Sequence, residues 1–520
     1  MILTKALIRA AKNEGKRTAV VDGDVTLTYG ELAERVSRLK QALKAQGIGK
    51  GDRVALLLFN DFRYLELFYA VTALGAIVVP LNFRLGRLEI VELLQDCTPK
   101  AFFFHPEFAP MLPQIAMRVM SIRLFVRVDG QAGAESGFIK EYESLLRGVA
   151  PQPLTYDGVA PDDVAGIFYT GGTTGRPKGV MLTHANLVSN AYHGVVAFRF
   201  DRSTKYLHAA PMFHLADGAC TFAVTLVGGA HHHLRAFQPG AFLEWVGRHK
   251  PTACLLVPTM VNLIVNDPHV EEADCSSLRQ LVYGGSPMPV EVLQKAQALW
   301  PHISFIQGYG MSEAAPLVTT LAPEDHQPAD SVRLASCGQP IVGVEVKLVD
   351  ERGNEAGVGE VGEIIVRGPN VMKGYWNQPE LTAEAIRDGW YHSGDLAYRD
   401  EEHYFYIVDR KKDMIVTGGE NVYSVEVEQV LYRHPVVVEA AVIGVPDPVW
   451  GEAVKAIVVK RNGPEADEQA LIDFCRRQLA GFKVPKSVEW VDELPKSGAG
   501  KILKRKLREA YWAGREKKVN

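Results

Sequence analysis

A glycine- and threonine-rich loop is the strongest chemical signal in the chain. Residues Tyr169–Gly179 read YTGGTTGRPKG, follow the apolar strand-like segment Ala165–Phe168, and precede a helix expected to begin near Thr183. Glycines let backbone N–H groups approach phosphate oxygens, threonine hydroxyls donate hydrogen bonds, and Arg176 and Lys178 add positive charge. The loop does not match GxxxxGK[ST], which argues against a Walker-type NTPase. A flexible linker seldom combines these residue types, so the sequence predicts a phosphate-binding loop.

A second segment, Gln307–Pro316 (QGYGMSEAAP), combines an aromatic ring, a hydroxyl and a carboxylate in Tyr309, Ser312 and Glu313. An aromatic ring can stack on a nucleobase, and a carboxylate beside phosphates can hold Mg²⁺. Because Tyr-Gly pairs are common in turns, this segment taken alone is only a weak signal.

Charged residues recur in Trp390–Asp395 (WYHSGD) and in Asp409–Asp413 (DRKKD). The Asp395 carboxylate can accept hydrogen bonds from ribose hydroxyls, as acidic residues do in other nucleotide sites, and Arg410 can add contacts to ribose or phosphate. In isolation, a surface turn followed by a solvated run of charges is the simpler interpretation.

The C-terminal segment Pro495–Leu507 (PKSGAGKILKRKL) places Lys501 at the start of an expected basic helix. From Lys496 to Asn520 the chain has nine Lys or Arg residues against two acids, Glu509 and Glu516. A solvated helix face preceded by a loop is the simplest interpretation of this segment on its own.

These segments need a scaffold, and the hydrophobic pattern predicts an α/β one. Helical and strand patterns alternate over residues 29–105 and again from Val164 to about Ile306, which is typical of stacked βα units with mostly parallel sheets. After about Gly338, short alternating strands separated by glycine-containing turns predict a small β-rich subdomain. From Lys411 onward a compact α+β pattern predicts a separate C-terminal domain of roughly 110 residues.

Composition agrees with a large globular protein. The 520 residues are 47% hydrophobic and 23% charged, and the net charge of −4 argues against a chain-wide nucleic-acid-binding surface. The six cysteines are scattered without CxxC spacing, so neither a disulfide framework nor a zinc knuckle is expected. The N-terminus lacks a long apolar signal core and no apolar stretch is long enough to cross a bilayer, which predicts a cytoplasmic protein.

Two other patterns are expected to carry no chemistry. Gly357–Gly362 (GVGEVG) satisfies GxGxxG, but a strand, Glu363–Arg367, follows where a dinucleotide-binding loop needs a helix, so a pair of turns is expected. His231, His232 and His233 are adjacent on an expected strand, and their side chains must alternate between its two faces. They therefore cannot all bind one metal ion, and a solvated or packed strand end is expected instead.

The four chemical segments together resemble the adenylate-forming superfamily in order and spacing, over nearly the whole chain. This superfamily includes acyl- and aryl-CoA synthetases, firefly luciferase and the adenylation domains of peptide synthetases. YTGGTTGRPKG resembles its phosphate loop, with Gly171 where serine is usual, and QGYGMSE resembles its adenine and magnesium segment, with Ser312 where threonine is commoner. YHSGD and DRKKDMIVTGGENV resemble its ribose-binding and hinge segments, and PKSGAGKILKRKLR resembles its catalytic-lysine segment.

The resemblance implies a role for each matching residue. The triphosphate would be oriented by Thr170, Gly172, Thr173, Thr174, Gly175 and Lys178, and the adenine slot would be lined by Gly285, Ser286 and Pro287, with Tyr309 stacked on the base. Phosphate and Mg²⁺ would be contacted by Ser312 and Glu313, and the ribose by Asp395 and Arg410. The hinge residue would be Lys412, the loop lining the pantetheine tunnel would be Gly418 and Gly419, the catalytic lysine would be Lys501, and the gate beside the acyl site would be His214.

The resemblance also implies the reaction and the domain organisation. A carboxylate would attack the α-phosphate of ATP, with Mg²⁺, Lys501 and the loop's donors neutralising charge, to give an acyl-adenylate and pyrophosphate. The thiol of coenzyme A would then displace AMP. The expected parts are an N-terminal acyl-activating domain (1–409), a hinge (410–412) and a mobile C-terminal lid (413–520) that rotates between the two half-reactions.

The expected acyl pocket is small and apolar, which favours an alkyl substrate. Its segments, His214–Cys220, Val257–Val261, Gly284–Gly285 and Gly310–Leu317, contain no Lys or Arg to bind a second carboxylate. We therefore expect a medium- or long-chain fatty acid rather than a malonate-like acid. An aryl-CoA ligase for coumarate- or benzoate-like acids and an enzyme loading a separate carrier protein remain alternatives.

The motifs also bear on two further possible functions. A relative that only binds nucleotide is disfavoured because every charged position of the motif set is present, whereas the motifs alone do not separate a luciferase-like oxygenase from a ligase. The expected partners are ATP, CoA, Mg²⁺ and a small carboxylic acid, with no nucleic acid. The tail cations other than Lys501 are expected to be solvated and to attract the phosphates of CoA. A weak peripheral contact with a membrane and a homodimer are left open.

Overall fold

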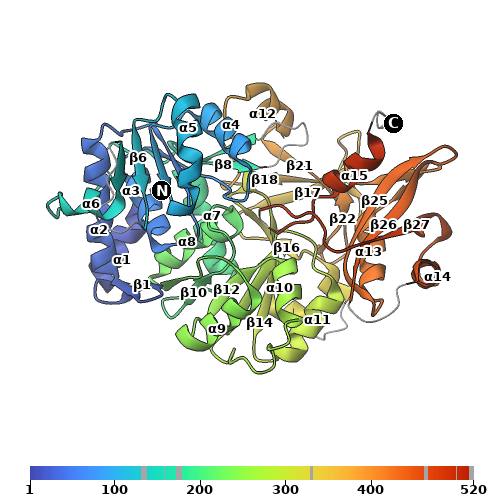
Figure 1. Ribbon diagram of the computed structural model, residues 1–520. Helices are drawn as coiled ribbons and strands as arrows, with labels where there is room; N and C mark the ends of the chain where they lie inside the picture. Colours follow the sequence, from blue (N-terminus) through green and yellow to red (C-terminus); the bar gives the residue numbers. More distant parts are fainter. Residues whose placement is uncertain are drawn as a thin grey trace.

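The computed structural model describes residues 1–129, 138–156, 158–170, 178–327, 332–461, 467–498 and 500–513. Figure 1 shows a large N-terminal body, coloured blue through yellow, with a smaller orange and red C-terminal domain against one end of it. The predicted alternation is confirmed: the helix expected over residues 29–46, for example, is α2 (Tyr29–Ala45), and the strand expected over 52–58 is β3 (Arg53–Leu57).

The first large sheet of the body has nine strands. Their order is β16-β15-β14-β13-β12-β10-β11-β1-β2, and the strands from β14 to β1 are parallel. The strands are β1 (Thr18–Asp22), β2 (Val25–Thr28), β10 (Lys205–His208), β11 (Ala230–His233), β12 (Ala253–Leu256), β13 (Gln280–Gly284), β14 (Ser304–Gly310), β15 (Leu317–Leu321) and β16 (Gln339–Pro340).

The second large sheet has eight strands in the order β19-β9-β8-β4-β3-β5-β6-β7, parallel from β8 to β7. Besides β3, its strands are β4 (Ile77–Pro80), β5 (Ala101–Phe104), β6 (Leu124–Arg127), β7 (Ile139–Glu141), β8 (Val164–Thr170), β9 (Lys178–Thr183) and β19 (Gly374–Tyr375). The mostly parallel character of both sheets, predicted from the βα alternation, is therefore confirmed.

Helices pack between and around the two sheets. Those of the body are, besides α2, α1 (Thr4–Glu14), α3 (Phe62–Ala73), α4 (Arg87–Cys97), α5 (Leu112–Arg118), α6 (Tyr142–Arg147), α7 (His184–Ala197), α8 (Leu215–Val227), α9 (Pro239–His249), α10 (Pro258–Val265), α11 (Val290–Leu299) and α12 (Pro379–Ala385). Because α3 contacts both β1 and β4, and α7 contacts both β9 and β15, these helices lie between the sheets. In the described ranges no helix is long and apolar enough to cross a membrane.

A small antiparallel sheet carries the chain from the body to the C-terminal domain. Its strands are β17 (Glu345–Val349), β18 (Gly362–Arg367), β20 (Ile386–Arg387), β21 (Trp390–Arg399) and β22 (Phe405–Arg410). The β-rich subdomain predicted after Gly338 is thus present. The GVGEVG segment forms turns that lead into β18, with Gly359 at φ +78°, as expected for a segment that binds no dinucleotide.

The C-terminal domain has its own sheet and its own core. It contains β23 (Ile415–Thr417), β24 (Glu420–Val422), β25 (Val437–Asp447), β26 (Gly451–Lys460), β27 (Ser487–Val491), α13 (Ser424–Tyr432), α14 (Glu468–Arg476) and α15 (Lys504–Trp512). Buried apolar side chains of α13, β25, β26 and α14 pack together without the body. The body's last strand ends at Arg410 and β23 begins at Ile415, on either side of the predicted hinge.

Candidate active site

The glycine-rich loop joins two antiparallel strands rather than a strand and a helix. β8 ends at Thr170 and β9 begins at Lys178, and α7 follows β9 directly. We predicted that a helix follows the loop directly, and this prediction missed β9. The predicted start of that helix, near Thr183, agrees with the N-terminus of α7. The predicted phosphate contacts Gly172, Thr173, Thr174 and Gly175 lie outside the described residues.

Side-chain contacts hold both ends of this hairpin. The hydroxyl of Tyr169 donates to the carboxylate of Asp96 at the end of α4. At the other end, the Lys178 ammonium lies over the ring of Tyr375, 5.3 Å from its centroid. Thr183 caps α7, because its Oγ1 accepts a hydrogen bond from the backbone N–H of Asn186 at 3.1 Å.

Glu313 is a buried carboxylate held by residues far along the chain. Its Oε1 accepts a 2.9 Å hydrogen bond from the hydroxyl of Tyr375, and its backbone carbonyl accepts one from the N–H of Met372 at 2.8 Å. Tyr375 belongs to β19, which pairs with β9, so the strand after the phosphate loop and the carboxylate share one neighbour. Tyr375 could not be identified from the sequence, because no fixed spacing connects a Gly-Tyr-Trp segment to a carboxylate 62 residues away.

Asp395 and Arg410 face each other across two neighbouring strands. The antiparallel register of β21 and β22 pairs them directly, and the Arg410 guanidinium Nε lies 3.2 Å from Asp395 Oδ1. The other carboxylate oxygen of Asp395 accepts a 2.8 Å hydrogen bond from the Tyr309 hydroxyl. Burial and the Asp395 charge hold the pKa of Tyr309 well above its usual value, so its hydroxyl stays a donor.

Lys501 reaches this group from the C-terminal domain. Burial, followed by the positive charge of Arg410, lowers the pKa of its ammonium to about 8, and the carboxylates of Asp395 and Glu313 act in the opposite direction. Lys501 and the Asp395–Arg410 pair line the same cavity, whereas Glu313 acts from outside its lining. A polyanion bound there would raise the pKa of Lys501 again and keep it cationic.

His214 is the half-buried residue that precedes α8, and it does not line the cavity described below. Desolvation, followed by the charge of Lys501, lowers the pKa of its imidazole to about 3. The imidazole is therefore neutral at physiological pH.

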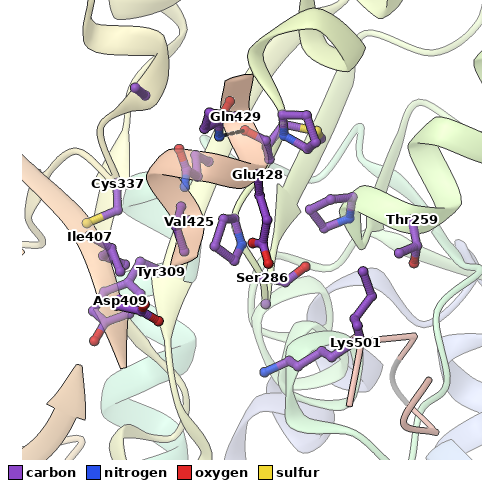
Figure 2. A pocket seen from close by; sticks show the side chains of 18 of the residues that line it. Thr259, Ser286, Tyr309, Cys337, Ile407, Asp409, Val425, Glu428, Gln429 and Lys501 are labelled. Carbon is purple, nitrogen blue, oxygen red and sulfur yellow. Dashed lines mark hydrogen bonds between the residues drawn. The ribbon is translucent and has the colours of Figure 1, made fainter. Parts of the chain in front are cut away.

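A cavity lies where several of these residues meet, between the body and the C-terminal domain (Figure 2). Seven of the predicted site residues line it: Gly285, Ser286, Pro287, Tyr309, Asp395, Arg410 and Lys501. Figure 2 shows Lys501 entering from the C-terminal loop on the same side as Ser286 and Thr259, with Tyr309 and Asp409 opposite. The cavity therefore combines an aromatic side chain, a carboxylate paired with a guanidinium, and a half-buried lysine.

Eight described residues of the predicted site do not line this cavity: Thr170, Lys178, His214, Ser312, Glu313, Lys412, Gly418 and Gly419. Gly418 and Gly419 form the turn between β23 and β24 at φ +59° and +85°, and neither lines the cavity. A Cβ on Gly418 would lie 2.7 Å from the indole of Trp450, so only glycine fits this turn. Lys412 lies in the connection between β22 and β23, and its backbone carbonyl accepts a hydrogen bond from Arg508 at 3.0 Å.

The basic tail was predicted to be solvated, and this is wrong for two of its cations. The Lys504 ammonium lies 2.7 Å from Glu428 and donates to the Ser424 hydroxyl at 2.6 Å, while Arg508 pairs with Asp413 at 2.7 Å. Their side chains are only 15% and 14% exposed. Each cation is paired with a carboxylate of its own domain, which offsets the cost of removing its charge from water.

Three further cavity-lining residues of this network escaped sequence analysis. Asp409 accepts hydrogen bonds from the N–H and the hydroxyl of Ser424 at 2.6 and 2.8 Å, and Glu428 and Lys504 line the same cavity. Asp409 had a sequence signal, because it stands beside Arg410 in the charged segment DRKKD.

The histidine run is packed in the sheet. His231 and His233 lie on one face of β11, and the ring centroid of His208 on the neighbouring strand β10 lies 5.4 and 5.0 Å from theirs; His232 is also buried. His208 hydrogen-bonds to Asp217 at 2.6 Å and to His231 at 3.1 Å. Of the two expected alternatives, a solvated or a packed strand end, the structure has the packed one. Within the described ranges no three His, Cys, Asp or Glu side chains form a group that could hold a metal ion.

Known proteins match the chain over nearly its full length. A family profile described as AMP-binding enzyme matches residues 7–376, and one described as AMP-binding enzyme C-terminal domain matches residues 426–501. A feruloyl-CoA synthase of Amycolatopsis sp is 43% identical over 505 residues, which cover 97% of this chain and 98% of that protein.

Other relatives differ in the acids that their names carry. The medium/long-chain-fatty-acid–CoA ligase FadD8 of Mycobacterium tuberculosis is 37% identical over 522 residues, covering 98% of this chain and 90% of that protein. The crystal structure of the anthranilate CoA ligase AuaEII in complex with anthranoyl-AMP superposes with a TM-score of 0.91 at 26% identity, covering 98% of this chain and 97% of that one.

Proposed function

The chain belongs to the family of AMP-binding enzymes, and from this premise we propose that it is an AMP-forming acid–thiol ligase acting at the cavity between its two parts. The observation that carries the proposal is the position of Lys501, which is half-buried and lines one cavity together with the Asp395–Arg410 pair. This arrangement suits a reaction between two anions, because positive charge is concentrated where a carboxylate must meet a phosphate.

In the first half-reaction, a carboxylate oxygen of the acid attacks the α-phosphorus of ATP, and the bond to pyrophosphate breaks. Tyr309 and the segment Gly285–Pro287 hold the adenine, and Asp395 with Arg410 hold the ribose. Lys501 neutralises charge on the carboxylate and the α-phosphate as the new bond forms. The loop that begins after Thr170, together with Ser312 and Lys178, holds the departing phosphates.

The residues present also fit a magnesium ion held mainly by substrate phosphates. Mg²⁺ prefers one or two carboxylates together with phosphate oxygens and water, and Glu313 is a single carboxylate whose orientation is fixed by Tyr375. When bound, the ion would supply charge neutralisation at the phosphates. No cage of protein ligands is needed for such a site.

In the second half-reaction, the thiol of CoA attacks the acyl carbon, AMP leaves, and the thiol proton goes to solvent. We propose that the C-terminal domain, residues 413–520, rotates about the hinge at 410–412 to withdraw Lys501 and bring Gly418 and Gly419 to the cavity. Their present position outside the cavity supports this proposal, since a role for this turn at the reacting atoms requires a second arrangement.

The segments expected to form the acyl pocket carry small or apolar residues, such as Ala219 and Cys220 on α8 and Gly310 at the end of β14. Such residues can contact an alkyl chain or an aryl ring, so similarity to known enzymes is the better guide to the substrate. A relative that is 43% identical is named a feruloyl-CoA synthase, and one that is 37% identical a fatty-acid ligase. We therefore rank aryl acids of the hydroxycinnamate type first and medium- or long-chain fatty acids second.

A panel of carboxylic acids tests this ranking. Pyrophosphate release and acyl-CoA formation would be measured with ferulate, coumarate, benzoate, decanoate and palmitate, each with and without CoA. We expect the highest kcat/KM with a hydroxycinnamate and formation of its CoA thioester. Activity confined to the alkyl acids would restore the fatty-acid assignment. Pyrophosphate release from an accepted acid without any acyl-CoA product would contradict the thiol acceptor and point to loading of a carrier protein.

A further inference from the structure

The loop that carries Lys501 is bound to the body through two of its backbone carbonyls. The Arg84 guanidinium donates to the carbonyl of Gly498 at 2.9 Å, and the Thr259 hydroxyl donates to the carbonyl of Gly500 at 3.0 Å. Arg84 follows β4 in the body and Thr259 belongs to α10, so two separate elements contact the loop just before the lysine. Arg84 lies outside every segment singled out in the sequence, whereas Thr259 lies in the segment Val257–Val261 and also lines the cavity.

Both carbonyls belong to glycines, and a larger residue at either position would force neighbouring atoms to move. A Cβ on Gly498 would lie 2.2 Å from the amide nitrogen of Asn82, and a Cβ on Gly500 would lie 3.0 Å from the Thr259 hydroxyl. Gly500 also has φ +81°, which side chains rarely adopt. At both contacts, therefore, the backbone of the loop lies directly against side chains of the body.

Hydrogen bonds within the loop also connect Ser497 to Lys501, so the contacts of the loop with the body determine where Lys501 lies. Ser497 N donates to the Lys501 carbonyl at 2.7 Å, and Lys501 N donates to the Ser497 hydroxyl at 3.1 Å. On the other side, Lys501 Cε lies 3.6 Å from the Cβ position of Gly285, at the cavity wall. Figure 2 shows Thr259 beside the segment that carries the lysine.

We propose that Arg84 and Thr259 are positioning residues for the first half-reaction, forming a latch that holds Lys501 at the nucleotide and releases it for the second. This inference rests on the proposed function, since it assigns the two residues to one half of that reaction. Each of the two residues is assigned this role because its side chain contacts the backbone of the lysine loop.

The chemistry of the two contacts suits a latch that must open. Each contact is a single hydrogen bond to a neutral carbonyl rather than an ion pair, and the bond from the charged Arg84 is the stronger of the two. Within the C-terminal domain, by contrast, the lysine-bearing end of the chain is fixed by ion pairs, such as Lys496 with Glu439 at 2.8 Å and Lys504 with Glu428 at 2.7 Å. The loop can therefore leave the body while staying attached to its own domain.

Measurement of each half-reaction separately tests the latch. Thr259→Val removes the hydroxyl with little change in shape, and Arg84→Met removes the donor. We expect each to slow single-turnover acyl-adenylate formation about five-fold and the double variant about thirty-fold, because each removes one hydrogen bond made in the first arrangement only. Thioester formation from supplied acyl-AMP and CoA should stay at the wild-type rate or rise.

Matched controls separate positioning from general damage. Thr259→Ser keeps the hydroxyl and should restore adenylate formation, and Arg87→Met, at an exposed residue three positions further along the chain, should leave both half-reactions unchanged. Gly498→Ala, where the added Cβ meets Asn82, disturbs the same contact from the other side and should reproduce the split between half-reactions if either first variant fails to fold.

The latch is overturned if the double variant forms adenylate at the wild-type rate, or if both half-reactions fall equally in folded variants. Failure of the proposed function would look different, because the wild-type protein would then release no pyrophosphate with any acid of the panel.

Discussion

Lys501→Ala is expected to reduce acyl-adenylate formation by about a hundred-fold or more while leaving thioester formation from supplied acyl-AMP within about two-fold of wild type. The ammonium is the charged group that the C-terminal domain contributes beside Asp395 and Arg410, and its loss removes charge neutralisation at the α-phosphate. The second half-reaction does not need this neutralisation, because the acyl–phosphate bond already exists and AMP leaves.

Rapid-quench measurement of labelled acyl-AMP, and of acyl-CoA from synthetic acyl-AMP, follows the two steps separately. Lys506→Ala is the matched control, because Lys506 is an exposed lysine of the same basic segment and its loss should affect neither step. An equal loss of both half-reactions in Lys501→Ala would show that the lysine supports the fold or both reactions, which contradicts its assigned role.

Glu313→Gln is expected to slow adenylate formation by about a hundred-fold and to raise the Mg²⁺ concentration needed for half-maximal rate. The amide keeps the size of the side chain and can still accept a hydrogen bond from Tyr375, so the change removes charge rather than shape. The neutral side chain no longer attracts a divalent cation held by the phosphates.

Titration of the adenylation rate with Mg²⁺, together with calorimetric binding of ATP with and without Mg²⁺, checks this expectation. Glu324→Gln, at an exposed acid that pairs with Arg199, serves as the control and should leave both unchanged. An unaltered Mg²⁺ dependence in a folded Glu313→Gln variant would rule out Glu313 as a ligand of the ion.

Most of the scaffold was predictable because its elements are long and strongly patterned. The alternation of helices and strands in the body and the compact α+β pattern of the C-terminal domain followed from hydrophobic periodicity, as did the change to short strands after Gly338. The short strand β9 was missed, since Lys178–Thr183 lies between a glycine-rich loop and a helix and shows too few alternations to reveal itself. Its pairing with β8 depends on a hairpin that only the tertiary structure shows.

Site residues that belong to local sequence motifs were predictable, whereas residues that tertiary contacts bring to the site were not. Asp395 and Arg410 stood in recognisable segments, yet their direct pairing depends on the register of β21 and β22. Tyr375 supports Glu313 only because β19 joins the sheet beside β9. Lys504 appeared to belong to a solvated tail because its partner Glu428 lies on α13, far away in sequence.

The central claim, that the acid attacks the α-phosphate of ATP, can be tested directly with isotope. The wild-type enzyme would be supplied with ATP, CoA, Mg²⁺ and an accepted acid labelled with ¹⁸O in both carboxylate oxygens, and the phosphorus products examined by mass spectrometry. One ¹⁸O atom should appear in AMP and none in pyrophosphate, since the oxygen that attacks the α-phosphorus stays with AMP when the thiol displaces it. Release of ADP, or formation of AMP without the label, would contradict the claim.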